Sequence, residues 1–208
     1  MDRLNQLARR LPTGVIYFAG LVPLAWIVWL TLSGGIGPDP VQAIEHRLGL
    51  LGLQFLIASL CISPLRWVGL NLLKFRRALG LLAFLYVVLH LLAWVILDMG
   101  LRWAEVGADL VKRPYIIVGM LGFLALVPLA VTSNQYSIRA LGPKWTSLHK
   151  LAYLAVLLGA AHFLILVKAW PLEPILYLLA AVLLVVARPL HRRWKRHTRA
   201  ASRPSLTS

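Results

Sequence analysis

The stretch Thr146–Leu166, TSLHKLAYLAVLLGAAHFLIL, decides the fold because it is apolar, long enough to cross a bilayer, and carries two histidines. A transmembrane helix needs about 20 predominantly apolar residues. An ionisable side chain at membrane depth is costly, so its default interpretation is functional. His149 and His162 are 13 positions apart, a rise of roughly 20 Å along a helix. The pattern predicts one histidine near one membrane face and the other in the opposite half.

Composition places the whole chain in a membrane. Of its 208 residues, 60% are hydrophobic and 14% are charged, and the mean hydropathy is +0.77. A soluble domain carries about 25% charged residues. We therefore predict an all-α integral membrane protein, built as one bundle of six transmembrane helices. The apolar runs are 14–32, 46–65, 77–98, 115–132, 147–167 and 172–190.

The two ends of the chain differ from this apolar middle. Residues 1–13 form a short basic lead, residues 14–190 hold the six spans, and residues 191–208 form a basic tail. His191 and His197 fall in that tail and are expected to be solvated, and 202–208 is expected to be disordered. No internal repeat is evident in the sequence.

The net charge of +15 follows the loops, and its distribution argues against a nucleic-acid partner. One set of segments (the lead, 66–77, 133–150 and the C-terminal end) holds 17 of the 22 basic residues and one of the 7 acidic residues. The alternate segments hold 5 basic and 6 acidic residues. The positive-inside rule puts the basic set, and with it both termini, in the cytoplasm. Basic residues near a membrane surface also attract anionic lipid.

A third histidine lies at the same predicted depth as His162. The third and fifth spans cross the membrane in the same direction. His90 follows Arg77 by 13 positions in the third span, as His162 follows His149 in the fifth. Imidazole nitrogen is a common axial ligand of heme iron. We predict that His90 and His162 clamp a heme in the outer half of the membrane, although a proton relay or a metal site would also explain buried histidines.

The inner half of the membrane holds only one candidate heme ligand on these two spans. His149 matches Arg77 in depth, and a guanidinium does not ligate iron. An inner heme would need His149 with another ligand, or with no sixth ligand. Arg76 and Arg77 could pair with heme propionates or with a flavin phosphate. Alternatively, they serve only as positive-inside anchors.

The longest outer loop, 99–113, is the first candidate for a docking surface. Its sequence over 101–111, LRWAEVGADLV, could form a short interfacial helix.

Five segments resemble the ferric reductase-like transmembrane family, which includes NADPH oxidases. They are Ser63–Trp67, Arg76–Trp94, Lys112–Phe123, Pro128–Asn134 and Trp145–Leu154, and the likeness spans nearly the whole chain. Within it, a closer resemblance is to the membrane subunits that serve bacterial methionine-sulfoxide reductases. The resemblance implies heme b, with FMN as a second cofactor, and His90, His162 and His149 as iron ligands. It also implies electron transfer from the quinone pool, across the inner membrane, to a periplasmic molybdenum-containing reductase that repairs oxidised proteins.

The sequence keeps two other functions open. The fingerprint G-x-G-x-x-G is absent and 19 residues follow Pro189, so we expect electrons from a membrane quinol or a separate flavoprotein. With no catalytic cysteine and no acid–base dyad, the chain is expected to be an electron conduit without a substrate-reducing site of its own. The first alternative is a free-standing ferric or oxygen reductase fed by a cytosolic NAD(P)H-flavin reductase. The second is a non-redox transporter whose histidines relay protons or metal.

Overall fold

Helices make up the regular structure of the described part of the chain. The structure is a computed structural model that describes residues 1–167, 169 and 171–201. Its elements are α1 (Asp2–Arg10), α2 (Thr13–Leu32), α3 (Pro40–Trp67), the 3₁₀ turn η1 (Leu73–Phe75), α4 (Arg76–Ala93), the π-helical turn η2 (Trp94–Asp98), α5 (Trp103–Lys112), α6 (Pro114–Val131), α7 (Gln135–Leu141), α8 (Pro143–Leu148), α9 (Leu151–Leu166) and α10 (Leu172–Ala201). The segment predicted to be disordered, 202–208, and Lys168 of the outer loops lie outside the described residues.

Six helical segments among the described residues are long and apolar enough to cross a membrane. They are Thr13–Leu32, Pro40–Trp67, Leu73–Asp98, Pro114–Val131, Pro143–Leu166 and Leu172–Thr198. The hydrocarbon of a membrane offers no hydrogen-bond partners to the backbone, and a helix pairs its own N–H and C=O groups. The predicted all-α bundle with six spans is confirmed, and the protein is a multi-pass membrane protein.

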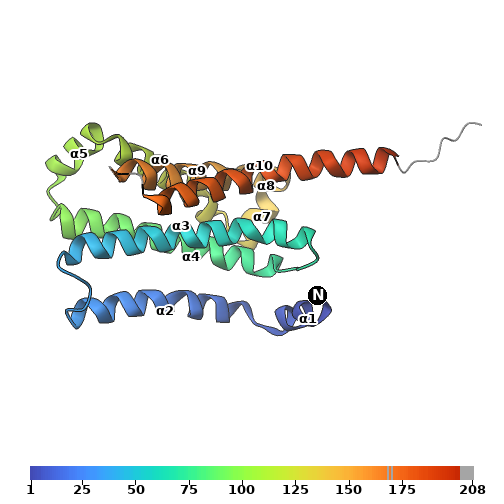
Figure 1. The fold of residues 1–208 in the computed structure, drawn as a ribbon, viewed down its shortest axis with the longest axis horizontal. Helices are drawn as coiled ribbons and strands as arrows, with labels where there is room; N and C mark the ends of the chain where they lie inside the picture. Colours follow the sequence, from blue (N-terminus) through green and yellow to red (C-terminus); the bar gives the residue numbers. More distant parts are fainter. Residues whose placement is uncertain (168, 170, 202–208) are drawn as a thin grey trace, which may run out of the picture.

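The bundle has a central group of helices and one helix set apart (Figure 1). α3 and α4 lie side by side, α6, α9 and α10 cover one side of them, and α2 runs along the other side. Fully buried residues such as Ala83 and Val156 belong to the core shared by the central helices. α2 is tied to this core by Tyr86, whose buried hydroxyl donates to the Gly20 carbonyl over 2.7 Å.

The two ends of the bundle carry different short helices. α5 lies at one end, and α1 and the last described turns of α10 lie at the other (Figure 1). We call these the α5 end and the α1 end. α1 is held to the loop after α3, because Asn5 Nδ2 donates to the Gly69 carbonyl (2.8 Å) and Lys74 Nζ donates to the Arg9 carbonyl (2.9 Å). The location of the α1 end in the cytoplasm stays a prediction.

Helix starts follow the sequence closely at the α5 end. Asp39 precedes α3, and its Oδ1 accepts from the Gln42 amide over 3.1 Å. Pro40 and Pro114 occupy the first positions of α3 and α6, where a missing N–H leaves no bond unmade. The first turns of α3 and α6 at the α5 end are therefore fixed by their own sequence.

The fifth span is not one continuous helix. α8 ends before His149, and α9 begins after Lys150. The Lys150 amide bonds the Ser147 carbonyl over 3.1 Å, a three-residue spacing that tightens the chain into a turn. The prediction of an unbroken helix over 147–167 is therefore wrong at its start. His149 precedes the helix that carries His162.

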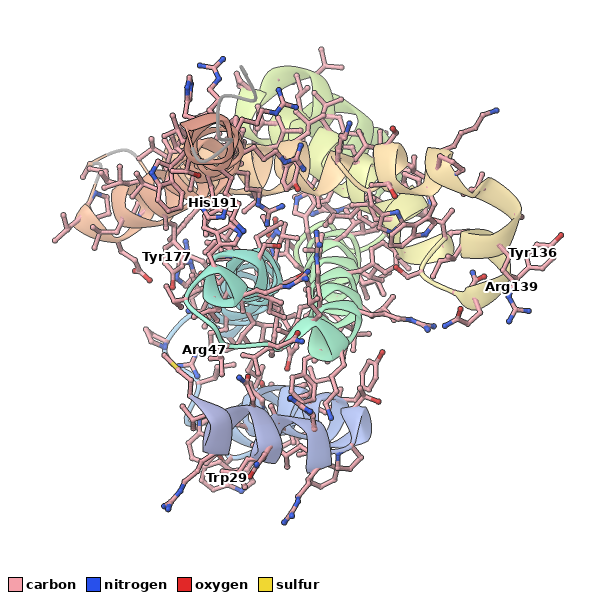
Figure 2. The ribbon with its side chains drawn as sticks, turned by 90° about the vertical axis from the view of Figure 1, so that its right-hand side faces the viewer. Trp29, Arg47, Tyr136, Arg139, Tyr177 and His191 are labelled. Atoms are coloured by element: carbon pink, nitrogen blue, oxygen red, sulfur yellow. The ribbon has the colours of Figure 1, made fainter. Side chains whose placement is uncertain are left out.

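α10 continues past the point where the last span was expected to end. It runs through Pro189 to Ala201, so the first part of the predicted tail is helical. His191 is half-buried rather than solvated, and its ring stacks on Trp67 with centroids 4.0 Å apart and planes at 10°. Figure 2 shows it between α10 and α3. The division into lead, bundle and tail stays a prediction.

Candidate functional site

Two histidines from different helices face each other inside the bundle. His90 lies on α4 and His162 on α9, with ring centroids 6.2 Å apart and ring planes at 73°. Both side chains are half-buried and line one cavity of about 860 Å³. Two imidazoles that share one metal ion through bonds of about 2 Å have ring centroids roughly 6 Å apart. The structure therefore brings together two residues at a separation that suits a shared metal.

Each ring is held by a backbone carbonyl of the neighbouring helix. His90 Nδ1 donates to the Glu45 carbonyl on α3 over 2.8 Å, and His162 Nδ1 donates to the Tyr115 carbonyl on α6 over 2.7 Å. A carbonyl oxygen can only accept, so the proton of each neutral ring is on Nδ1. The lone pair of each Nε2 is then available to a metal.

These contacts belong to an arrangement that occurs twice. Four positions after each carbonyl residue stands a glycine, Gly49 on α3 or Gly119 on α6, which lies against the histidine ring. Three positions further stands a second glycine, Gly52 or Gly122. A Cβ built there would lie within 4 Å of the amide nitrogen three positions before the histidine and of the carbonyl oxygen seven positions before it. These contacts between α3 and α4 are thus matched by the contacts between α6 and α9. The G-x-x-G spacing that α3 and α6 share is the sequence signal of this arrangement that sequence reasoning missed.

The cavity is apolar along the bundle and polar at the α5 end. Its lining at that end includes Asp39, Gln42, Glu45, Asp98, Arg113 and Tyr115. Arg113 donates to the Tyr115 hydroxyl over 2.9 Å and pairs with Asp109 over 3.2 Å. That hydrogen bond, together with Asp109, raises the pKa of Arg113 above its ordinary value. A permanent cation therefore stands at the α5 end of the cavity.

His149 lies apart from this cavity. Its Nδ1 donates to the Trp145 carbonyl over 3.1 Å, and its ring stacks on the Trp145 indole with centroids 3.8 Å apart. His149 Nε2 is buried and has no hydrogen-bond partner among the described residues. Arg76 and Arg77 begin α4 at the α1 end and do not line the cavity, and Arg76 is close enough to His149 to act on it electrostatically.

The pair of histidines is too small a set for a bare metal ion. Among the described residues, no group of three or more His, Cys, Asp or Glu is placed to hold one. Structural and catalytic zinc sites use three or four protein ligands. Two facing imidazoles suit a cofactor that brings its other ligands with it, as a porphyrin does.

The helices that carry this site match a known family. Residues 46–160, more than half of the chain, match the family described as ferric reductase like transmembrane component. The chain belongs to this family. The resemblance found in the sequence is therefore confirmed.

Relatives from three Brucella species share the sequence over most of its length. The proteins from Brucella ovis, Brucella abortus and Brucella suis are each 49% identical over 182 residues, which cover 86% of this chain and 83% of the relative. Each of these relatives is named protein-methionine-sulfoxide reductase heme-binding subunit MsrQ. No solved structure matches the chain.

Arg188 forms a buried polar contact near the α1 end. Sequence reasoning had placed it only in the set of basic loop residues. Arg188 is 8% exposed, and its Nη2 donates to the Leu60 carbonyl over 2.9 Å. Its Nη1 donates to the Tyr153 hydroxyl, and the guanidinium lies 4.4 Å from the centre of that ring. Pro64, four positions after Leu60, lacks the N–H that this carbonyl would otherwise accept. Arg188 replaces that bond and ties α10 to α3 and α9.

Proposed function

We propose that the chain is the heme b membrane subunit of a methionine-sulfoxide reductase system. It passes electrons from the respiratory quinone pool across the inner membrane to MsrP, a periplasmic molybdenum-containing reductase that repairs oxidised periplasmic proteins. The chain itself has no substrate-reducing site in this proposal, and FMN is its second cofactor. Support comes from the relatives named as heme-binding subunits, with 49% identity over 86% of the chain.

The facing pair His90 and His162 is the observation that carries the proposal. Their ring centroids are 6.2 Å apart, close to the roughly 6 Å of two imidazoles on one metal, and both rings border the 860 Å³ cavity. A bound heme b would supply one-electron redox chemistry there. The protein holds both rings through their Nδ1 protons, and the apolar helices around the cavity exclude water and lower the local dielectric.

We place a second cofactor at His149, near the α1 end. His149 would be the protein ligand of a second heme iron, and its buried, unpartnered Nε2 supports this role. Arg76 and Arg77 would hold the carboxylates of that heme or the phosphate of FMN, since guanidinium groups bind both kinds of oxyanion well. Electrons would then enter at the α1 end and leave at the α5 end.

The loop 99–113 is our candidate for the MsrP docking surface. The structure forms a helix within it, α5, on which Trp103 is 68% exposed and Val111 is 80% exposed. Exchange of both side chains for serine should slow electron transfer to MsrP and leave the heme content unchanged, because neither residue lines the cavity. Unchanged transfer to MsrP would move the docking surface elsewhere.

The first test is a dithionite-reduced minus oxidised visible spectrum of the purified protein, with heme and flavin quantified per chain. Two hemes per chain would support ligands at both levels. One heme with one flavin would support a heme at His90 and His162 and FMN near His149. A colourless protein would overturn the proposal and favour a transporter.

The family match supports a second candidate, a free-standing ferric or oxygen reductase of the cytochrome b type. It would take electrons from a separate cytosolic NAD(P)H-flavin reductase. Rapid reduction of iron or oxygen by the purified protein and such a reductase, without MsrP, would favour this candidate. Rapid reduction of MsrP alone would favour the first.

A further inference from the structure

We propose that Gly49 and Gly119 are positioning residues for the two facing imidazoles. The lack of a side chain at each glycine lets a histidine ring lie directly against the neighbouring helix. Nδ1 can then reach the carbonyl one turn before the glycine, and the direction of Nε2 is set. The inference rests on the proposed heme site and adds to it the residues that orient the ligands.

Gly119 on α6 is the tighter of the two contacts. A Cβ built there would lie 2.7 Å from His162 Nδ1, 3.0 Å from Cε1 and 3.2 Å from Cγ. Nδ1 is the atom that donates to the Tyr115 carbonyl over 2.7 Å. An alanine methyl would therefore displace the ring and lengthen or break that hydrogen bond.

Gly49 on α3 has the same relation to His90 in a milder form. A Cβ there would lie 3.1 Å from His90 Nδ1, 3.2 Å from Cε1 and 3.5 Å from Cγ. The ring donates to the Glu45 carbonyl over 2.8 Å. The milder contact predicts a smaller displacement for alanine at Gly49 than at Gly119.

General helix packing does not account for these two positions. Small residues let membrane helices approach closely, and Gly52 and Gly122 serve that purpose. A Cβ at Gly52 would first meet Val87 Cγ2 at 2.8 Å, and one at Gly122 would first meet Leu158 Cβ at 3.4 Å. At Gly49 and Gly119 the three nearest atoms all belong to a histidine ring.

The relation between the two rings provides a readout that fold stability alone would not change. The ring planes are 73° apart, and each plane is fixed by one carbonyl and one glycine. When two imidazoles bind one ferric iron, the angle between their planes governs the splitting of the iron d orbitals. The largest g value in the electron paramagnetic resonance spectrum therefore reports how the rings are held.

The experiment compares Gly119→Ala, Gly49→Ala and a matched control in the full-length protein in detergent. Gly80→Ala on α4 is the control, since its Cβ would meet only Ser59 Oγ at 3.8 Å. We expect Gly119→Ala to shift the largest g value and the midpoint potential, and to weaken heme binding by about 10- to 100-fold, as for other lost outer partners of metal ligands. Gly49→Ala should give a smaller shift in the same measurements, and Gly80→Ala none.

Wild-type g values, potential and heme content in both Gly119→Ala and Gly49→Ala would overturn the inference and leave the heme proposal intact. Wild-type protein without heme would instead overturn the proposed function itself. If Gly119→Ala fails to insert, Gly49→Ala decides the matter, because its milder contact preserves the helix pair.

Discussion

The histidines near the two ends of the bundle differ in how their rings are supported. Toward the α5 end, His90 and His162 face each other, and each donates to a carbonyl of another helix. Toward the α1 end, His149 bonds a carbonyl of its own segment, and the residue in the matching position of α4 is Arg77. The two facing imidazoles thus lie where the α3–α4 and α6–α9 contacts match each other. His149 has no second imidazole opposite it in α4.

Removal of one imidazole from the α5-end pair should have the largest effect. We expect His162→Ala or His90→Ala to lose most bound heme while the protein still inserts, since one of the two imidazoles that would hold the heme is gone. Heme per chain, measured on purified protein, checks this. His197→Ala is the control, because that side chain is exposed on α10. A full low-spin spectrum in both variants would remove these histidines from the ligand set.

A smaller and selective loss should follow from His149→Ala. We expect one cofactor per chain to disappear while the low-spin resonance signal of the His90–His162 level is unchanged, because His149 does not line that cavity. Combined quantification of heme and FMN checks this. If neither falls, His149 is a structural residue that stacks on Trp145, and the comparison between the two levels becomes one between a cofactor site and a packing contact.

The sequence predicted the positions of His90 and His162, toward the α5 end, better than the structure around His149 and Arg188, toward the α1 end. Depth along a helix depends only on spacing, so the matched positions of His90 and His162 could be read directly. The turn at His149 and the buried position of Arg188 could not, because both depend on contacts with distant residues. The carbonyl freed by Pro64 is visible in the sequence, but the residue that satisfies it is 128 positions away.

Substitution of Arg188 measures how much a buried guanidinium near the α1 end contributes to the free energy of unfolding. Arg188→Met should lower the free energy of unfolding by about 1–3 kcal/mol, because the Leu60 carbonyl is left buried without a partner. Thermal unfolding in detergent measures this, and Arg188→Lys should recover part of the loss. Arg193→Met, at an exposed position of α10, is the matched control. Equal stability of the two methionine variants would show that water or lipid satisfies the carbonyl.

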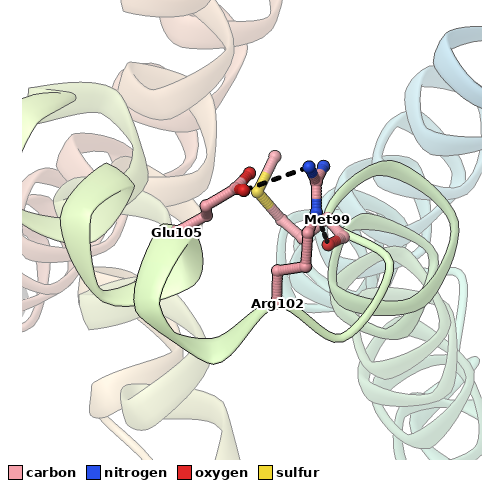
Figure 3. Close-up of polar contacts among 3 residues, drawn as sticks. All are labelled: Met99, Arg102 and Glu105. Atoms are coloured by element: carbon pink, nitrogen blue, oxygen red, sulfur yellow. Dashed lines mark hydrogen bonds and ion pairs between the residues drawn. The ribbon is translucent and has the colours of Figure 1, made fainter.

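The smallest effect is expected from the loss of an exposed ion pair at the α5 end. Arg102 Nε donates to the Met99 carbonyl over 2.9 Å, and its Nη1 pairs with Glu105 over 3.0 Å (Figure 3). The paired side chains are 60% and 52% exposed, and such pairs contribute about 0–1 kcal/mol. Glu105→Gln should therefore change the free energy of unfolding by less than Arg188→Met does. Because salt screens exposed charges, the difference from wild type should vanish at high ionic strength. A loss as large as that of Arg188→Met, at any salt concentration, would mean that α5 is fixed to the bundle by this pair rather than by its apolar contacts.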